Sequence, residues 1–312
     1  MRVRAAAIAA AALIAGCGAG APLPVQTPPA QPKAPAAQIQ VSNGPIIVGP
    51  GPTPLAVKLD APDVIRVPFH RPPRAGLLFD LDTGRVLWRR NPTRILPIAS
   101  LTKMMTALLV VDREQPQAMV RITREARQAA GSRVGMLPKK KPVRLESLLY
   151  WVLLPLGNDA AQALALKGAG ASGAFVVAMN ARAQKMSLGC THFTSVDGFV
   201  DSGNHSCAID LAALARAVLD QPRLARIVGS RSVVLRFPTK GGKLYLFNNN
   251  PLLRTGYAGT IGVKTGYTDA AGHCLVAAVR GQGHRLGVVL LHSPDTNLQA
   301  RKLLDRGFRA LG

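Results

Sequence analysis

Aromatic and acidic residues are both scarce in this sequence. Phe, Trp and Tyr make up 4% of the 312 residues, and 39 Lys and Arg stand against 16 Asp and Glu, a formal net charge of +23. Such a charge suits a polyanionic partner. However, the sequence lacks the interleaved basic and aromatic stretches on which nucleic-acid bases stack, so we predict no nucleic-acid partner. With 48% hydrophobic residues, the chain can form a large folded core.

The apolar run at the N-terminus is too short to cross a bilayer. It covers Ala5 to Gly16, follows Arg2 and Arg4, and leads through small residues into Cys17. This pattern resembles a bacterial lipobox, which implies cleavage before Cys17, acylation of its sulfur and anchoring by two or more acyl chains. The alternative is an ordinary secretory signal with an incidental cysteine. Both interpretations predict export, either lipid-anchored at the outer face of the cytoplasmic membrane or in the periplasm or cell wall.

Proline is concentrated near the N-terminus, where 14 of the 24 prolines lie at or before Pro73. Proline-rich chain buries too little apolar surface to fold and tends to extended geometry. We therefore expect a signal over residues 1–17, a tether over 18–73 and one folded domain over 74–312. Whether the more apolar stretch NGPIIVGPGPTPLAV docks on that domain stays open.

Local patterns predict an α/β domain with strands at both ends. Two β-like runs, Leu77 to Leu81 and Arg85 to Trp88, flank Asp82-Thr83-Gly84, which is typical of a hairpin turn. Ala- and Leu-rich helical stretches follow between Ser100 and about Val228. Five β-like runs come next, before a closing helix from about Asn297 to Leu311: SVVLRF, KLYLF, TIGVKT, GHCLVAAV and RLGVVLLH. We expect the C-terminal strands to complete the sheet.

Three short motifs carry candidate functional side chains. In PIASLTKMM, Ser100 stands at an expected helix start and Lys103 follows on the same helix face, so the amine can reach the hydroxyl, although a helix cap is the simpler use of such a serine. In GVKTGYTDAAGHC, Lys264 and Thr265 can hold the terminal carboxylate of a peptide laid on a sheet edge, although a strand end and turn is the commoner use. In YWVLLPLGNDAAQALA, Asn158 lies in a turn between helices, and Asp159 is a candidate cap of the second helix.

In this order, the motifs resemble those of the serine D-alanyl-D-alanine carboxypeptidases, the low-molecular-mass penicillin-binding proteins. The resemblance runs from about Gly76 to the end of the chain and includes GNDAA, LGCTHFTSVDGF and RKLLDRGF. Class A β-lactamases share a similar motif trio. The stretch VKTGYTDAAGHCLV and the lack of a candidate for their deacylating Glu favour the carboxypeptidases. The resemblance implies a β-lactamase/transpeptidase-like α/β fold with an antiparallel sheet and a helical lobe, and an active site between them.

The resemblance also implies a role for each motif residue. Ser100 would attack the bond between the terminal D-alanines of a peptidoglycan pentapeptide and form an acyl-enzyme. Lys103 would be the general base, with its pKa lowered by partial burial and by the nearby cation of Lys264. Asn158 would hold the substrate amide and the Lys103 side chain. This chemistry requires no metal or organic cofactor, and β-lactam antibiotics would act as inhibitors.

Substrate binding would fall to the strand that contains Lys264, Thr265, Gly266 and Tyr267. The first two would bind the substrate carboxylate. The backbone N–H groups of Ser100 and Tyr267 would form the oxyanion hole.

The middle motif departs from the family. The usual pattern is Ser-x-Asn, whereas this chain has Leu156-Gly157-Asn158, and no Ser, Thr or Tyr lies between Trp151 and Gln162. Because leucine cannot relay a proton, an active carboxypeptidase and a catalytically weakened stem-peptide or penicillin-binding homologue both remain open. A D,D-endopeptidase with the same chemistry is a third hypothesis. An Arg that the family often places before the last helix is also missing, since Arg301 comes too late.

The cysteines suit an exported protein. Cys190 and Cys207 lie at the two ends of a loop that a disulfide between them would close. The alternative is two unpaired thiols. Cys274 is expected in the core. We predict no metal site, because metal-ligand spacing such as His-Glu-x-x-His is missing around three histidines of the domain, His192, His205 and His273.

Overall fold

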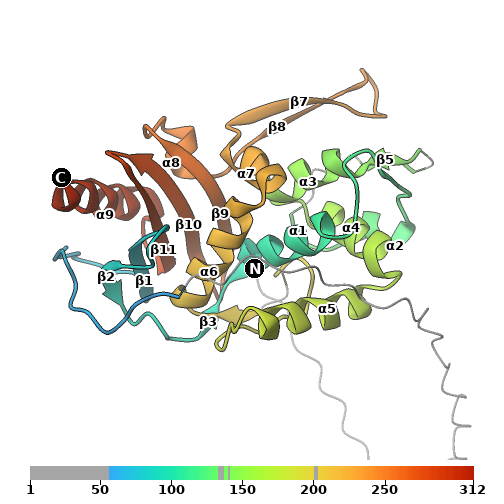
Figure 1. Ribbon diagram of the computed structural model, residues 1–312. Helices are drawn as coiled ribbons and strands as arrows, with labels where there is room; N and C mark the ends of the chain where they lie inside the picture. The colour runs from blue at the N-terminus through green and yellow to red at the C-terminus, as the bar shows by residue number, and fades with distance from the viewer. Residues whose placement is uncertain (1–55, 133–136, 140, 200–202) are drawn as a thin grey trace, which may run out of the picture. The chain divides into compact units, whose positions relative to one another are not determined.

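A five-stranded antiparallel sheet forms the centre of the domain (Figure 1). The computed structural model describes residues 56–132, 137–139, 141–199 and 203–312. The strand order is β2-β1-β11-β10-β9, so β9 lies at one edge. The strands are β1 (Ala75–Asp80), β2 (Val86–Arg90), β9 (Thr260–Thr268), β10 (Gly272–Gly281) and β11 (His284–Ser293). The predicted α/β fold with an antiparallel sheet is confirmed.

Helices cover both faces of this sheet (Figure 1). Helix α9 (Thr296–Leu311) packs against β10 and β11 on one face, and a helical lobe lies on the other. The lobe contains η1 (Ala99–Thr102), α1 (Lys103–Val111), α2 (Arg124–Arg127), α3 (Leu145–Leu153), α4 (Asn158–Ala169), α5 (Ser172–Lys185), α6 (Ala208–Asp220) and α7 (Pro222–Gly229). The short α8 (Pro251–Arg254) precedes β9.

Alternate residues of the central strands enter two different cores. In β10, Leu275 and Ala277 pack with Leu303 of α9, whereas Val276 and Ala278 belong to the larger core shared with the helical lobe. Because side chains alternate across a strand, a strand buried on both faces must be apolar throughout. This explains the unbroken apolar run in GHCLVAAV.

The remaining strands form two-stranded sheets of their own. The first two of the five C-terminal β-like runs form the hairpin of β7 (Ser232–Arg236) and β8 (Lys243–Phe247), which projects from the lobe in Figure 1, and only the last three join the central sheet. The other pairs are β3 (Leu96–Pro97) with β6 (His205–Ser206) and β4 (Met119–Val120) with β5 (Val143–Arg144). The expectation that C-terminal strands complete the sheet is confirmed for β9, β10 and β11.

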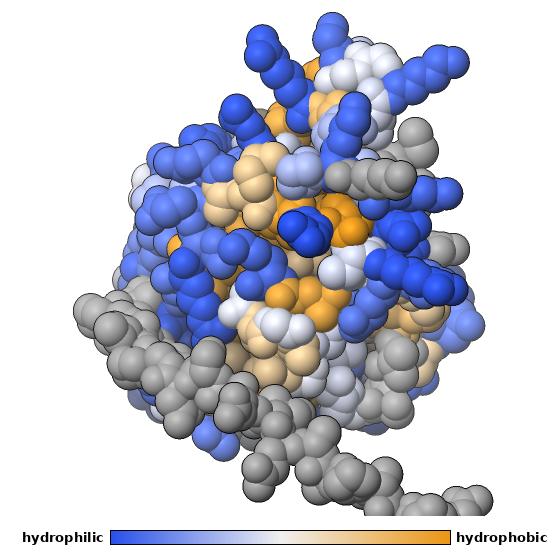
Figure 2. Space-filling view, turned by 90° about the vertical axis from the view of Figure 1, so that its right-hand side faces the viewer, coloured by the Kyte–Doolittle hydropathy of each residue, from blue (hydrophilic) through white to orange (hydrophobic). Residues whose placement is uncertain are grey.

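Hydrophilic side chains surround a smaller hydrophobic area on the face of the molecule shown in Figure 2. Large apolar side chains exposed on the lobe include Met119 and Val177.

Among the described residues, no single helix is both long and apolar enough to cross a membrane. Helices α4 and α5 together meet that criterion, but only as a pair bent by 84°.

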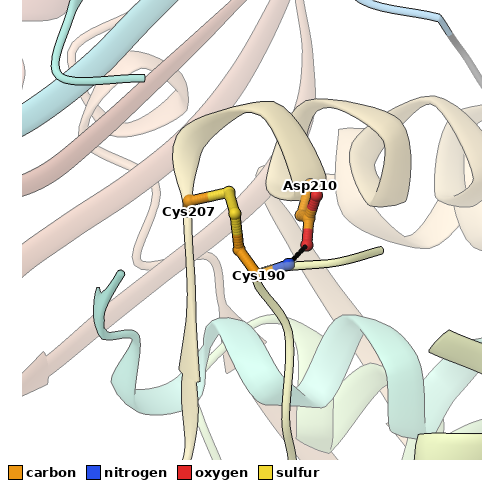
Figure 3. A group of neighbouring side chains, drawn as sticks. All are labelled: Cys190, Cys207 and Asp210. Carbon is orange, nitrogen blue, oxygen red and sulfur yellow. Dashed lines mark hydrogen bonds between the residues drawn. A yellow bond between two sulfur atoms is a disulfide. The ribbon is translucent and has the colours of Figure 1, made fainter. Parts of the chain in front are cut away.

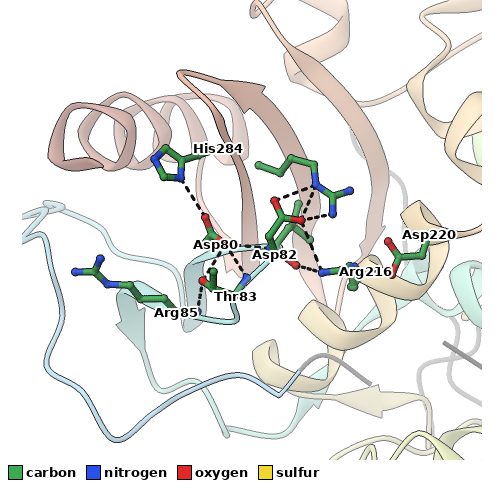
Figure 4. Close-up of polar contacts among 9 residues, drawn as sticks. Asp80, Asp82, Thr83, Arg85, Arg216, Asp220 and His284 are labelled. Carbon is green, nitrogen blue, oxygen red and sulfur yellow. Dashed lines mark hydrogen bonds and ion pairs between the residues drawn. The ribbon is translucent and has the colours of Figure 1, made fainter. Parts of the chain in front are cut away.

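The predicted first hairpin is confirmed, and its turn is held by charged side chains (Figure 4). Asp80 Oδ1 accepts hydrogen bonds from the backbone N of Asp82 at 3.0 Å and of Thr83 at 2.8 Å. Arg285 of β11 binds the Asp82 carboxylate through its Nε at 3.0 Å and lowers the pKa of that carboxyl. Arg216 of α6 lies 4.0 Å from the same carboxylate. The turn thereby connects the sheet to the lobe.

The folded part of the chain begins before Arg74, so the expected end of the tether at residue 73 is wrong. Residues 56–73 run along β2, where the Ile65 N–H donates to Leu87 O at 3.0 Å and the Arg89 guanidinium donates to Leu59 O and Ala61 O at 2.6 and 2.9 Å. Ile65 is buried. A proline-rich segment can stay ordered in this way because another element satisfies its backbone groups. Cys17 and the rest of the expected signal and tether lie outside the described residues.

A disulfide joins Cys190 to Cys207, as predicted, with their Cα atoms 5.6 Å apart (Figure 3). Asp210 lies beside the bridge, where its Oδ2 accepts from the Cys190 N–H at 2.8 Å and from Thr191 Oγ1 at 2.7 Å. Burial raises the pKa of Asp210. The two sulfurs and this carboxylate lie close enough together to suggest a metal site, but the sulfurs are bonded to each other. The third cysteine of the domain, Cys274, is buried in β10, as expected.

Candidate active site

The Lys103 amine is the centre of the site. It is completely buried, and its Nζ lies 2.8 Å from Ser100 Oγ, 2.7 Å from Asn158 Oδ1 and 2.7 Å from the backbone oxygen of Asp197. These partners come from η1, from the first turn of α4 and from the loop after α5. The structure therefore brings the first and third sequence motifs into direct contact.

Ser100 is held in the short helix η1, directly before α1. The N-cap of η1 is Ile98, and Ser100 Oγ accepts a hydrogen bond from Lys103, so the simpler interpretation of this serine as a cap is wrong. Ala99 has a φ of 49°, a conformation that is uncommon for residues other than glycine. Strain of this kind is often retained at functional sites. Here it precedes the residue whose oxygen faces the lysine.

Asn158 is fixed at both ends of its side-chain amide. Its Oδ1 accepts from Lys103 Nζ, its Nδ2 donates to Ala130 O at 2.7 Å, and its backbone N donates to Ser132 O at 2.8 Å. Helix α4 begins at Asn158 with Gly157 as its N-cap. The expectation that Asp159 caps this helix is wrong, because Asp159 already lies in the first turn and accepts from the N–H of Ala160.

The turn before Asn158 is tightly constrained. A Cβ on Gly157 would lie 2.0 Å from Cδ1 of Trp151, which is fully buried, so only glycine fits at this position. Leu156 has a φ of 76°, which costs a residue with a Cβ roughly 1–2 kcal/mol. The leucine that replaces the expected hydroxyl therefore also stands in an unfavourable backbone conformation.

The edge strand β9 lies directly against η1. A Cβ on Gly266 would be 3.0 Å from both Ser100 N and Ile98 O, so the absence of a side chain at Gly266 lets the strand approach the helix. Lys264 is buried, and its Nζ donates to Thr265 O at 3.2 Å. Tyr267 is 53% exposed. The second sequence motif thus lies beside Ser100 with one edge of its strand available.

Burial dominates the electrostatics of both lysines. It lowers the pKa of Lys103 to about 8, although the carboxylates of Asp197 and Asp159 act in the opposite direction. Burial, and then the positive charge of Lys103, lower the pKa of Lys264 well below its usual value. Burial therefore lowers the pKa of Lys103 as predicted. Lys264 is not among the groups that lower the pKa of Lys103, contrary to the prediction; instead, the positive charge of Lys103 lowers the pKa of Lys264.

Asp197 is the contributor that sequence reasoning missed. Its hydrogen bond to Lys103 comes from the backbone carbonyl, so the residue type gives no signal of this contact in the sequence. The neighbouring Gly198 is the available clue: its φ is 73°, and a Cβ there would lie 2.0 Å from Ala99 O. A glycine is required where this loop approaches η1, and that approach places Asp197 O at the lysine.

The three oxygens around Lys103 suit both protonation states of the amine. An ammonium group has three donors, one for each oxygen. A neutral amine would donate to Asn158 and Asp197 and turn its lone pair toward the Ser100 hydroxyl. The site can therefore exchange one proton between Ser100 and Lys103 without moving a heavy atom.

Comparison with known proteins identifies the family of this fold and site. Residues 71–295 match the D-alanyl-D-alanine carboxypeptidase family, and the chain belongs to that family. The chain is 34% identical over 245 residues to the D-alanyl-D-alanine carboxypeptidase DacB2 of Mycobacterium tuberculosis, covering 76% of this chain and 82% of that protein. It is 31% identical over 244 residues to DacF of Bacillus subtilis, covering 75% of this chain but only 62% of DacF.

Solved structures agree with this assignment. A D-alanyl-D-alanine carboxypeptidase from Mycobacterium tuberculosis matches with a TM-score of 0.73 at 33% identity, over 78% of this chain and 94% of that one. A mutant of a Streptomyces DD-transpeptidase matches with a TM-score of 0.71 at 29% identity, over 78% of this chain and the whole of the other. A relative from Pseudomonas aeruginosa, 32% identical over 227 residues, is named a D-alanyl-D-alanine endopeptidase; the match covers 71% of this chain and 72% of that protein.

Proposed function

We propose that this protein is a serine D-alanyl-D-alanine carboxypeptidase that acts on peptidoglycan stem peptides through an acyl-enzyme. The observation that carries the proposal is the buried Lys103 amine within 2.8 Å of Ser100 Oγ, with a pKa lowered to about 8. A serine hydroxyl becomes a nucleophile when an adjacent base removes its proton. A base with a pKa near the working pH is the most effective for this purpose.

In the proposed reaction, Ser100 Oγ attacks the carbonyl carbon between the two terminal D-alanines. The hydroxyl proton passes to Lys103 Nζ. When the C–N bond breaks, the leaving amine of the last D-alanine takes up a proton, and Lys103 is the group in place to give it. Water then attacks the ester carbonyl and passes a proton to Lys103, and Lys103 gives that proton to Ser100 Oγ as the ester bond breaks. Lys103 ends each cycle in the state in which it began.

Substrate binding is assigned to the free edge of β9. The substrate carboxylate would lie at Lys264 and Thr265, and the carbonyl under attack would accept hydrogen bonds from the N–H groups of Ser100 and Tyr267. The close approach of Gly266 to Ser100 N supports this placement. Donors aimed at a developing oxyanion typically contribute about 3 kcal/mol each.

Leu156 favours a second candidate function, a homologue that binds stem peptides and penicillins but turns them over slowly. In the family pattern, a hydroxyl at this place carries the proton to the leaving group. Without it, protonation by Lys103 alone would limit the reaction. Endopeptidase action on cross-linked peptides would use the same residues.

The proposal is tested by D-alanine release from a pentapeptide and by covalent labelling with a fluorescent penicillin, both measured on the full-length protein. Release together with labelling supports the carboxypeptidase. Labelling without release supports the weakened homologue. A protein that does neither is not a serine enzyme of this kind.

Replacing Leu156 by Ser should raise D-alanine release, because the hydroxyl restores a proton carrier beside the leaving group. We expect a gain of about 10²-fold, at the low end of what general acid groups contribute. Leu156→Ala is the matched control, since it removes the same bulk without adding a hydroxyl. If the Ser and Ala variants release D-alanine equally fast, proton delivery from this position is not limiting and the weakened-homologue hypothesis is wrong.

The rate of acylation by penicillin should rise with pH up to about 8 and then level off. Lys103 serves as the base only in its neutral form, and its pKa is lowered to about 8, so each pH unit below that value leaves roughly tenfold less base. The measurement is the second-order rate constant of labelling between pH 6 and 9. A rate that stays constant over this range would contradict the assignment of Lys103 as the base.

For the location of the protein, we propose export and lipid anchoring through Cys17. The support is the N-terminal sequence alone, with its two arginines, short apolar run and small residues before the cysteine. Mass spectrometry of the mature N-terminus tests this directly, since a lipoprotein begins at an acylated Cys17.

A further inference from the structure

A cavity of about 400 Å³ opens at the ends of β10 and β11. Four basic side chains line it: Arg71, Arg74, His273 and His292. None of the described residues that line it is acidic. Such a lining favours an anion.

The two arginines project from a fixed backbone. The segment 71–74 contains Pro72 and Pro73, whose rings limit its conformations. Four hydrogen bonds hold it to α9, β2, β11 and the loop after β2: Gln299 Nε2 to Arg71 O at 2.7 Å, Arg90 Nε to Pro73 O at 2.8 Å, Arg74 N to Leu291 O at 3.0 Å, and Asn91 Nδ2 to Arg74 O at 3.0 Å. The positive charges of Arg71 and Arg74 therefore extend from a backbone that the rest of the domain holds in place.

The histidine side of the cavity is equally constrained. His292 has a φ of 50°, which is uncommon for a residue with a side chain. Gly272 lies beneath it with a φ of 63°, and a Cβ at that position would be 2.8 Å from His292 Nδ1. Gly272 thus leaves room for the His292 ring, and His292 itself keeps an uncommon backbone conformation where it lines the cavity.

The cavity adjoins the strand that would hold the substrate. His273 pairs with Tyr267 across the two strands, and their rings lie 4.6 Å apart. A substrate whose carboxylate lies at Thr265 and whose scissile carbonyl lies at Tyr267 runs antiparallel to β9. Its residues upstream of the scissile bond would then continue past Tyr267 toward the cavity.

The charges of the arginines are available to a ligand. Among the described residues, neither Arg71 nor Arg74 has an ion-pair partner. The carboxylates close in sequence to the two histidines have partners of their own: Asp269 accepts from the Tyr267 hydroxyl at 3.1 Å, and Asp295 caps α9 by accepting from Leu298 N at 2.9 Å.

We propose that this cavity is an anion subsite that binds a carboxylate of the stem peptide upstream of the scissile bond. The enzyme would then prefer stem peptides with a free acid at that position over peptides in which the acid is amidated. This inference rests on the function proposed above, and it adds the chemical class of the preferred substrate.

The inference is tested with two synthetic pentapeptides that differ in one side chain upstream of the scissile bond. This side chain ends in a carboxylate in the first peptide and in a carboxamide in the second. For the native protein we expect a KM about three- to tenfold lower for the peptide with the carboxylate, and a similar kcat for both peptides. This is the effect that two partly exposed ion pairs, one with each arginine, would have. The preference should weaken as salt is added. In the double variant Arg71→Gln, Arg74→Gln, the ratio of the two KM values should fall to about one.

Arg94→Gln is the matched control, since it removes an exposed arginine outside the cavity and should keep the native preference. Penicillin labelling of each variant reports whether Ser100 and its surroundings are intact. Equal KM values for the two peptides in a native protein that releases D-alanine would overturn the inference and leave the proposed function standing. A native protein that neither labels nor releases D-alanine would overturn both.

Discussion

Replacing Ser100 by Ala should abolish covalent labelling by penicillin and lower D-alanine release by about 10⁴-fold or more, because the acyl-enzyme ester has no oxygen to form on. The variant should stay folded. The Ser100 hydroxyl contacts the Lys103 amine rather than capping a helix, so its loss affects chemistry far more than structure. Labelling is measured by gel fluorescence, and folding by the midpoint of thermal unfolding.

Ser232→Ala is the control for this experiment, because Ser232 is an exposed serine on the β7 hairpin. It should label at the native rate. A penicillin adduct that persists in the Ser100 variant would place the nucleophile on another residue and would invalidate the mechanism proposed here.

Replacing Lys103 by Met should lower the acylation rate by about 10²- to 10⁴-fold, the range associated with loss of a general base. Methionine fills a similar volume, so the packing around α1 should persist. Two buried oxygens, Asn158 Oδ1 and Asp197 O, lose their donor, which should lower the free energy of unfolding by about 1–3 kcal/mol for each oxygen. That loss is small enough for the rate to be measured on folded protein.

The residual activity of the Lys103 variant should also lose its pH dependence, since the amine whose pKa is lowered to about 8 is gone. Lys167→Met is the control, because it removes a lysine far more exposed than Lys103 and should leave both the rate and its pH profile unchanged. A Lys103 variant that acylates at the native rate would show that Ser100 is activated by another base.

Most of the site could be predicted because its chemistry is encoded in short spacings. Ser100 and Lys103 lie three residues apart, so local helical geometry alone brings them together. Asn158 and Lys264 were placed through the resemblance to a known family, and the structure confirms that Asn158 reaches the lysine. The contact with Asp197 O was beyond prediction, because a backbone carbonyl leaves no trace in the residue type.

Predictions about boundaries failed for a different reason. Residues 56–73 contain several prolines and were expected to be a tether, but hydrogen bonds to β2 hold them in place. The contacts that order residues 56–73 come from distant parts of the chain, so local composition does not reveal them. Local composition also does not show that β7 and β8 pair with each other and stay outside the central sheet, because tertiary context determines which sheet a strand joins.

The turn at Asp82 joins the two parts of the domain that would supply the oxyanion donors. Arg285 on the sheet and Arg216 on α6 both hold this turn, so a movement that separated the sheet from the lobe would have to break charged contacts there. The two proposed oxyanion donors come from opposite sides of that boundary, Ser100 from η1 and Tyr267 from β9. A shift of about 1 Å at a reacting centre can cost about 10²-fold in rate. The spacing of the two proposed oxyanion donors therefore depends on the contacts that hold the sheet to the lobe.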